Sequence, residues 1–187
     1  LRGGDVASLE VRRDGAPLTL TVNVRPRPKE AEAVAITEYR AVVVDEGVRR
    51  TLVTRPPAPG RHPAVLYLTG IGCYSQESVG VVSTEAKLLY GLTRAGFVTM
   101  RVEKSGIGDG QGRPCQAEAS DLEAEVRGYA AGLQALREYE FVDRERVFLL
   151  GVSIGGVEAP LVAAGGTVRG VVVVNTVARA FLDYLQD

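Results

Sequence analysis

A serine set between glycines is the side chain in this sequence best suited to chemistry. The pentapeptide Gly151-Val152-Ser153-Ile154-Gly155 follows the apolar run at residues 147–150 and precedes residues 158–164, which can form a helix. A tight turn between a buried strand and a helix strains its serine, and the turn needs glycines because side chains there would clash. Ser153 is therefore the candidate nucleophile, with Gly151 and Gly155 shaping its turn. The alternative is a chance pentapeptide in a glycine-rich chain, so its surroundings decide.

Two backbone N–H groups could hold the negative charge that develops on a carbonyl attacked by Ser153. One belongs to Ile154, because the first N–H groups of a helix have no partner within it. The other is expected in the loop after an earlier strand, and the apolar residues 65–68 run into Thr69-Gly70-Ile71-Gly72-Cys73. We assign it to Ile71, with Gly72 as the alternative. An ordinary strand-to-helix turn would explain the same glycines without any site.

The elements that must position these groups alternate along the chain. Apolar runs typical of buried strands are separated by segments with helical spacing, which predicts an α/β fold with a mostly parallel sheet and helices on both faces. Ser120 is a candidate cap for one helix, whose apolar face would carry Leu122, Val126, Tyr129, Leu133 and Leu136. The expected strands are residues 64–68, 97–102, 146–150 and 168–174, and the expected helices are residues 82–94, residues 120–139 and the segment after Ser153.

Two hairpins precede this α/β pattern. Residues 7–13 and 17–25 are expected to pair around the turn dipeptide Asp14-Gly15. Pro26 and Pro28 then indicate a linker, because proline fixes φ and removes a backbone donor. Residues 34–44 and 48–54 are expected to form the second hairpin. We therefore divide the chain into a hairpin at residues 1–25, a linker at 26–30 and an α/β domain at 31–187.

Taken in order, the strand, the glycine loop and the serine turn resemble the α/β-hydrolase superfamily, whose first six strands would correspond to residues 34–187. Residues 101–110, Arg-Val-Glu-Lys-Ser-Gly-Ile-Gly-Asp-Gly, are similar to the family's loop after its fourth strand. The resemblance implies a partial α/β-hydrolase fold of the carboxylesterase type. It also implies acyl transfer to water, in which Ser153 attacks a carbonyl, the two N–H groups hold the oxyanion and a histidine relays the proton.

The histidine and the acid of such a triad should follow the last strand, and here the sequence departs from the family. The one histidine, His62, precedes the strand at residues 64–68 and would lie about 15–20 Å from that strand's carboxyl end at ~3.3 Å per residue. Asp183 and Asp187 fall in an expected final helix, where solvated charge is the usual explanation. We therefore expect a chain truncated at both ends and inactive alone, whose full-length form is an acyl hydrolase.

The first hairpin resembles the closing strands of a PDZ domain. The residues that carry this resemblance are Leu1-Arg2-Gly3-Gly4-Asp5 and the turn at Arg13-Asp14-Gly15. An isolated two-stranded hairpin is marginal in water, so we expect it to be the remnant of a larger module. The resemblance implies a peptide partner that binds through the missing part of that module.

Composition narrows the classes of partner. The chain has 187 residues, 45% of them hydrophobic, and a formal net charge of -1, which is typical of a globular protein. A charge near zero gives no attraction toward nucleic acid or anionic membranes, and no apolar run approaches the roughly 20 residues that cross a bilayer. Neither metal-ligand spacing nor a phosphate- or dinucleotide-binding loop occurs, so we expect no metal and no cofactor. The expected partner is a small acyl substrate.

Two cysteines are informative about the cellular compartment of the protein. Cys73 and Cys115 follow strands that are neighbours in the α/β-hydrolase order, which would bring them within disulfide range. Two unrelated thiols are the alternative. A bridge would favour an extracytoplasmic location, which the sequence otherwise leaves open.

Two other functions share the same residues. The protein could be a non-catalytic α/β-hydrolase scaffold that binds peptides with its PDZ-like part, or a serine peptidase on the same fold. A downstream sequence with no histidine after a final strand would decide for the scaffold.

Overall fold

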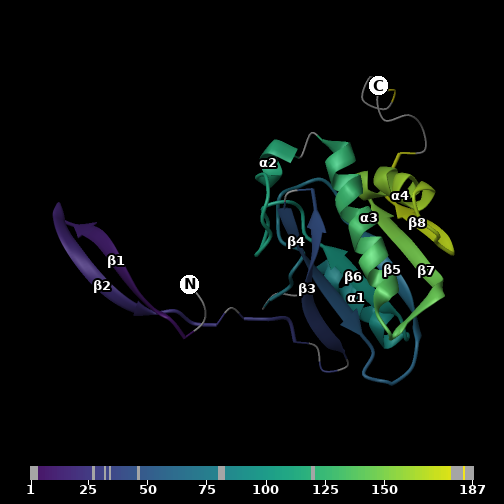
Figure 1. Ribbon diagram of the computed structural model, residues 1–187, viewed down its shortest axis with the longest axis horizontal. Coiled ribbons are helices and arrows are strands. Elements are labelled where there is room, and N and C mark those ends of the chain that lie inside the picture. Colours follow the sequence, from purple (N-terminus) through teal and green to yellow (C-terminus); the bar gives the residue numbers. More distant parts are fainter. Residues whose placement is uncertain are drawn as a thin grey trace. The chain divides into compact units, whose positions relative to one another are not determined.

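The chain divides into two compact units, Leu1–Glu30 and Ala31–Asp187. The computed structural model describes residues 4–26, 28–31, 33, 35–45, 47–79, 83–118, 121–177 and 183 (Figure 1). None of the helices within these ranges is long and apolar enough to span a lipid bilayer.

The first unit is an antiparallel hairpin of β1 (Val6–Arg13) and β2 (Ala16–Asn23). Its two-residue turn has φ of 52° at Asp14 and 80° at Gly15, as a turn that matches the twist of the strands requires. The hairpin predicted from the Asp-Gly dipeptide is thus present. Apolar side chains of both strands are exposed, among them Val6, Leu9, Val11 and Leu20.

The second unit is built on a six-stranded sheet with the order β3-β4-β6-β5-β7-β8. The strands β3 (Ile36–Val44) and β4 (Gly47–Arg55) form a hairpin, and β4 also pairs antiparallel with β6 (Val98–Val102). From β6 onward the sheet is parallel, through β5 (His62–Leu68) and β7 (Val142–Val152) to β8 (Gly170–Val174). The carboxyl ends of four parallel strands therefore meet at one edge of the sheet.

Helices cover both faces of this sheet (Figure 1). The helices α3 (Leu122–Glu138) and α4 (Ile154–Ala164) pack on one face, against a core that includes Leu66, Met100 and Leu149. The helix α1 (Thr84–Arg94) packs on the other face, where Val65 and Tyr67 point. Side chains alternate in direction along a strand, and β5 is apolar on both sides, as is typical of a strand covered by helices on both faces.

The helix boundaries differ from the predictions at their ends. The third helix begins at Leu122 with Asp121 as its cap, because the Asp121 carboxylate accepts the N–H of Ala124 at 3.0 Å, whereas the sequence favoured Ser120, which lies outside the described residues. Tyr129, Leu133 and Leu136 are buried as expected, while Leu122, in the first turn, is exposed. The single-turn helix α2 (Cys115–Glu118) was not predicted. Of the expected final helix, all but Asp183 lies outside the described residues.

Candidate active site

Ser153 lies between the last residue of β7 and the first residue of α4. Its φ of 57° and ψ of -122° form a conformation that non-glycine residues adopt rarely and only where the surroundings impose it. Its N–H donates to the carbonyl oxygen of Val174 on β8 at 3.0 Å, and its own carbonyl accepts the N–H of Gly156 at 2.9 Å. The hydroxyl does not cap the helix, and the residue is exposed. The turn therefore presents the serine at the carboxyl edge of the sheet.

The glycines around Ser153 are sterically required. A Cβ on Gly151 would collide with the carbonyl oxygen of Gly155, and a Cβ on Gly155 would collide with that of Leu68 at the end of β5. At Gly156 a Cβ would come within 2.6 Å of the Cβ of Thr176. Any side chain at these positions would push α4 away from the strand ends. The glycines of the predicted motif are thus required because the neighbouring residues leave no room for a side chain.

The glycine loop after β5 approaches Ser153. A Cβ placed on Gly70 would lie 3.3 Å from the Cβ of Ser153 and 3.8 Å from its Oγ, so a side chain there would press the two segments apart by a few tenths of an ångström. Ile71 is the next residue, and its side chain is 70% exposed. Ile154 is the first residue of α4, where an N–H has no intrahelical acceptor. The residues named from the sequence for the oxyanion site thus belong to two segments that meet at Ser153.

Two tyrosines hold the start of this glycine loop. The backbone N–H of Thr69 donates to the hydroxyl of Tyr129 on α3 at 3.2 Å, and the hydroxyls of Thr69 and Tyr74 lie 3.3 Å apart. Burial raises the pKa of Tyr129 well above its ordinary value. The Tyr129 hydroxyl is therefore a neutral acceptor for the loop.

A buried arginine network holds the next part of the loop. Arg50 on β4 donates to Glu103 at 2.8 Å and lies 3.0 Å from the carboxylate of Glu77. Glu103 in turn accepts the Ser75 hydroxyl at 2.6 Å and the Gln76 N–H at 3.0 Å. Glu103 is fully buried, and the side chains of Arg50 and Glu77 are 5% and 3% exposed. Glu103 thus fastens the loop to the sheet.

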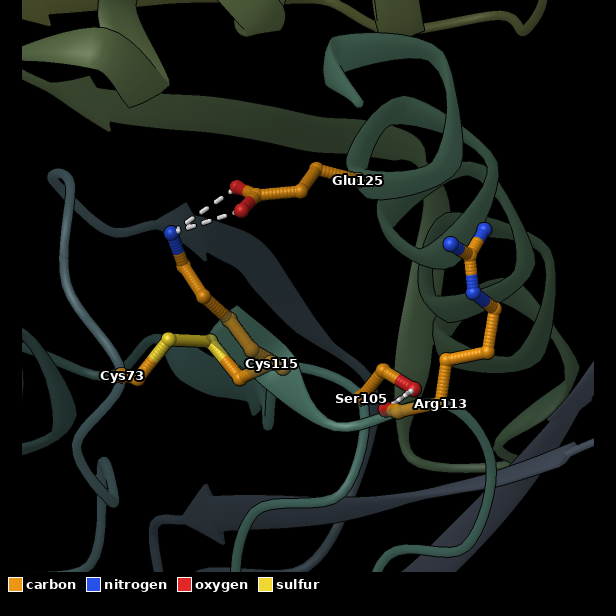
Figure 2. Close-up of a disulfide and its surroundings, with 6 residues drawn as sticks. Cys73, Ser105, Arg113, Cys115 and Glu125 are labelled. Atoms are coloured by element: carbon orange, nitrogen blue, oxygen red, sulfur yellow. Dashed lines mark hydrogen bonds and ion pairs between the residues drawn. A yellow bond between two sulfur atoms is a disulfide. The ribbon is translucent and has the colours of Figure 1, made fainter. Parts of the chain in front are cut away.

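A disulfide closes the same region. Cys73, in the loop after β5, is bonded to Cys115, at the start of α2, with their Cα atoms 5.7 Å apart. Figure 2 shows this bridge beside the segment in which the Ser105 hydroxyl donates to the carbonyl oxygen of Arg113 at 2.7 Å. Of the two alternatives for the cysteines, the structure thus has the bridge.

Three further charged groups form a buried cluster between α3 and α4. Lys104 Nζ lies 2.9 Å from both carboxylate oxygens of Glu125, the acid that is labelled in Figure 2. Glu158, on α4, is fully buried, and neither of its oxygens has a hydrogen-bond donor within the described part of the chain. Burial, followed by the neighbouring carboxyl group of Glu125, raises the pKa of Glu158 to about 9.

The candidate triad residues are not brought to Ser153. His62 is the first residue of β5, whereas Gly151, just before the Ser153 turn, pairs with Leu68 at the other end of β5, about 20 Å away at ~3.3 Å per residue. Its ring lies 3.0 Å from the carbonyl oxygen of Ala58. Asp183 is exposed, and Asp187 lies outside the described residues. No group of three or more His, Cys, Asp or Glu side chains that could hold a metal ion occurs in the described ranges.

The sequence analysis did not identify the buried residues that hold the glycine loop and the helix after Ser153 in place. Tyr129 was assigned only to the apolar face of a helix, and Arg50 was given no role. Glu158 left a usable signal, since it is the only charged residue in the apolar helix Ile154–Ala164 and such a helix is buried on most sides.

Comparisons with known proteins bear on this arrangement. No protein-family model matches the chain. Esterase EstD from Thermotoga maritima is 26% identical over 137 residues, which cover 72% of this chain and 32% of EstD. Among solved structures, a hypothetical protein from Pseudomonas aeruginosa superposes with a TM-score of 0.65 at 18% identity, over 78% of this chain and 44% of that one. Acetyl xylan esterase 1 from a Thermoanaerobacterium species gives 0.59 at 19% identity, over 77% and 49%.

The fold is that of the α/β-hydrolases. The predicted fold class, a mostly parallel α/β-hydrolase-like sheet with a separate N-terminal hairpin, is confirmed by these superpositions together with the strand order. The sequence similarity to EstD adds a distant relation to esterases. The chain spans between about a third and a half of the length of the three proteins compared.

Proposed function

We propose that the protein is a serine hydrolase that cleaves ester or related acyl bonds through an acyl-enzyme on Ser153. The observation that carries the proposal is the strained Ser153 turn with Gly70 of the preceding loop against it. In the reaction the Ser153 oxygen would form a bond to the acyl carbon while its proton passes to a histidine. The N–H groups of Ile154 and Ile71 would hold the oxyanion until the leaving group departs.

The position of Ser153 in the sheet is consistent with binding of an acyl substrate. Ser153 is exposed at the edge where four parallel strands end, which is where open α/β sheets bind their ligands. The relation to EstD and the superposition on an acetyl xylan esterase favour small esters as the substrate class.

The proton relay must come from elsewhere in the protein. His62 is the one histidine of the chain and belongs to the opposite edge of the sheet. We propose that the catalytic histidine and its acidic partner are contributed by a segment outside these 187 residues. A serine peptidase would use the same groups on the same fold.

Labelling by a fluorophosphonate probe tests the proposal. The full-length protein should form one covalent adduct, because the probe reacts with a serine activated by a base and an oxyanion site. Ser153→Ala should abolish the adduct, whereas Ser8→Ala, in the N-terminal hairpin, should leave it intact. An intact, folded protein that stays unlabelled, or a Ser153→Ala variant that still labels, would favour the non-catalytic scaffold.

The PDZ-like assignment and the compartment remain proposals of their own. The comparisons lend no support to a PDZ tail, and its basis is the loose resemblance around Arg13-Asp14-Gly15 together with the hairpin itself. Peptide mapping of the purified full-length protein would locate any further module. The Cys73–Cys115 bridge favours an oxidising compartment, because cytosolic thiols are kept reduced.

A further inference from the structure

The cluster of Glu158, Glu125 and Lys104 holds two carboxyl groups and one ammonium group in the protein interior. Glu158 is 0% exposed and Glu125 is 6% exposed. Lys104 donates to Oε1 of Glu125 and also lies 2.9 Å from its Oε2. Within the described residues, Oε2 of Glu125 and both oxygens of Glu158 accept no hydrogen bond. One cation therefore faces two acids, and it is paired with Glu125, so both oxygens of Glu158 are left without a donor.

A single proton resolves this excess of acceptors. Two ionised carboxylates can only accept, so their contact inside the protein would be repulsive and costly. If one acid keeps its proton, it becomes a donor to the other, and the pair behaves as one charged and one neutral group. Glu125 has the ammonium of Lys104 beside it and is therefore the acceptor of the pair. Glu158 is the group that stays neutral, and its O–H can donate to Oε2 of Glu125.

The cluster connects the Ser153 turn to the glycine loop after β5, which we call the oxyanion loop because it contains Ile71. Glu158 is five residues after Ser153 on α4, and Glu125 is one helical turn before Tyr129 on α3. The Tyr129 hydroxyl accepts the N–H of Thr69, which directly precedes the Gly70 that contacts Ser153. A hydrogen bond between Glu158 and Glu125 would therefore fix the helix of the nucleophile to the helix that holds the oxyanion loop.

We propose that Glu158 carries a proton at neutral pH, donates it in a hydrogen bond to Glu125, and so positions Tyr129 and the oxyanion loop against Ser153. The inference rests on the proposed hydrolase function. Glu158 and Tyr129 are positioning residues, because they act on the reacting atoms only through the loop. The same hydrogen bond would satisfy a polar cluster between α3 and α4, where two ionised carboxylates would be unfavourable.

The charges around Glu158 set the direction of its pH dependence. Glu125 and Tyr129 face it from α3, Lys104 from the end of β6 and Arg49 from β4. Burial and Glu125 raise the pKa of Glu158 to about 9, against the opposing effects of Lys104 and Arg49. The folded state thus holds the proton more tightly than the unfolded state. The resulting stability is fully present below the ordinary pKa of 4.5 and is lost as the pH rises through about 9.

Thermal unfolding of the full-length protein against pH tests the retained proton without any assay of activity. Glu158→Gln cannot titrate, so its Tm should gain on that of the wild type steadily between about pH 4.5 and pH 9. A Tm difference that does not change with pH would overturn the proposal. Glu125→Gln is the second variant, in case the first does not fold. It leaves Lys104 facing Glu158 alone, so the alkaline loss of stability seen in the wild type should shrink, and an unchanged loss would count against the shared proton.

Catalysis tests the positioning role. With p-nitrophenyl acetate as the probe, Tyr129→Phe should lower kcat about tenfold and leave KM within about twofold, because a displaced oxyanion donor weakens only the transition state. Tyr90→Phe, which removes the hydroxyl of a buried tyrosine on α1, is the matched control and should leave both constants unchanged. Equal kinetic constants for Tyr129→Phe and the wild type would overturn the positioning role. If the full-length wild type neither reacts with the fluorophosphonate probe nor hydrolyses the ester, the proposed function and the positioning role are both overturned. The unfolding experiment would still decide whether Glu158 carries a proton.

Discussion

Ser153 adopts a backbone conformation that costs about 1–3 kcal/mol for a residue with a side chain. The surrounding structure offsets that cost through the backbone bonds to Val174 and Gly156 and through the close approach of β5. A strained residue held this firmly is preorganised, since its hydroxyl does not have to be moved into place by a substrate. The strain is thus itself an observation that points to function at this position.

The glycine after Ile154 gives a prediction about stability at the residue scale. Gly155→Ala should lower the free energy of unfolding by about 3 kcal/mol, because its Cβ would collide with the carbonyl oxygens of Leu68 and Thr69. Gly165→Ala is the matched control at the other end of α4, where φ is -90° and a Cβ would meet only the Val162 oxygen at 3.8 Å. Its effect should stay below about 1 kcal/mol. Chemical denaturation measures both, and equal losses would contradict the steric account.

Sequence alone could predict the residues of the turn but not those that support it. Ser153 and its glycines obey a local rule, because the strand, the turn and the helix are consecutive in the chain. Tyr129 and Thr69 are 60 residues apart, and Arg50 and Glu103 are 53 apart. No local pattern distinguishes a charge that will be buried against a distant partner from one that will face water. The supporting contacts therefore needed the three-dimensional structure.

At the scale of elements, Arg50 ties strand β4 to the loop after β5. Arg50→Met should cost about 3–5 kcal/mol of stability, because Glu103 and Glu77 would be left buried without their cation. The control is Arg146→Met, whose partner Asp143 forms an ion pair with it at the surface, and its Tm should not change measurably. Thermal unfolding compares the two variants. A small effect at Arg50 would mean that Ser75 and the Gln76 N–H suffice to stabilise Glu103.

The succession of strands along the chain was predictable because the apolar runs are separated by clear turn residues. The ends of the strands were less predictable. For example, β7 extends from Val142 to Val152, whereas its apolar pattern covers only residues 146–150. The additional residues Asp143, Arg144 and Glu145 are charged and not buried, and they lie in an irregular stretch where the pairing with β5 shifts from Val142 to Val147. Hydrogen bonding of the backbone is not visible in side-chain patterns, which is why strand ends are lost first.

For the molecule as a whole, the disulfide is a cross-link between loops 42 residues apart. Its replacement in a Cys73→Ser, Cys115→Ser double variant should cost about 4 kcal/mol, because the unfolded chain regains the entropy of a closed loop of this length. Denaturation with and without a reducing agent provides the measurement and its control, since the double variant should not respond to reduction. Equal stability of the oxidised wild type and the double variant would contradict the prediction.

The position of β5 at the centre of the sheet has a consequence for synthesis. Its two partners follow it in the chain, and the second, β7, begins at Val142, 80 residues after His62. At ~5–20 residues per second a ribosome needs roughly 4–16 s to add that length. During this interval the apolar strand that leads to the glycine loop has an unpaired edge. A nascent chain of this protein is therefore expected to need a chaperone most between the emergence of β5 and that of the serine turn.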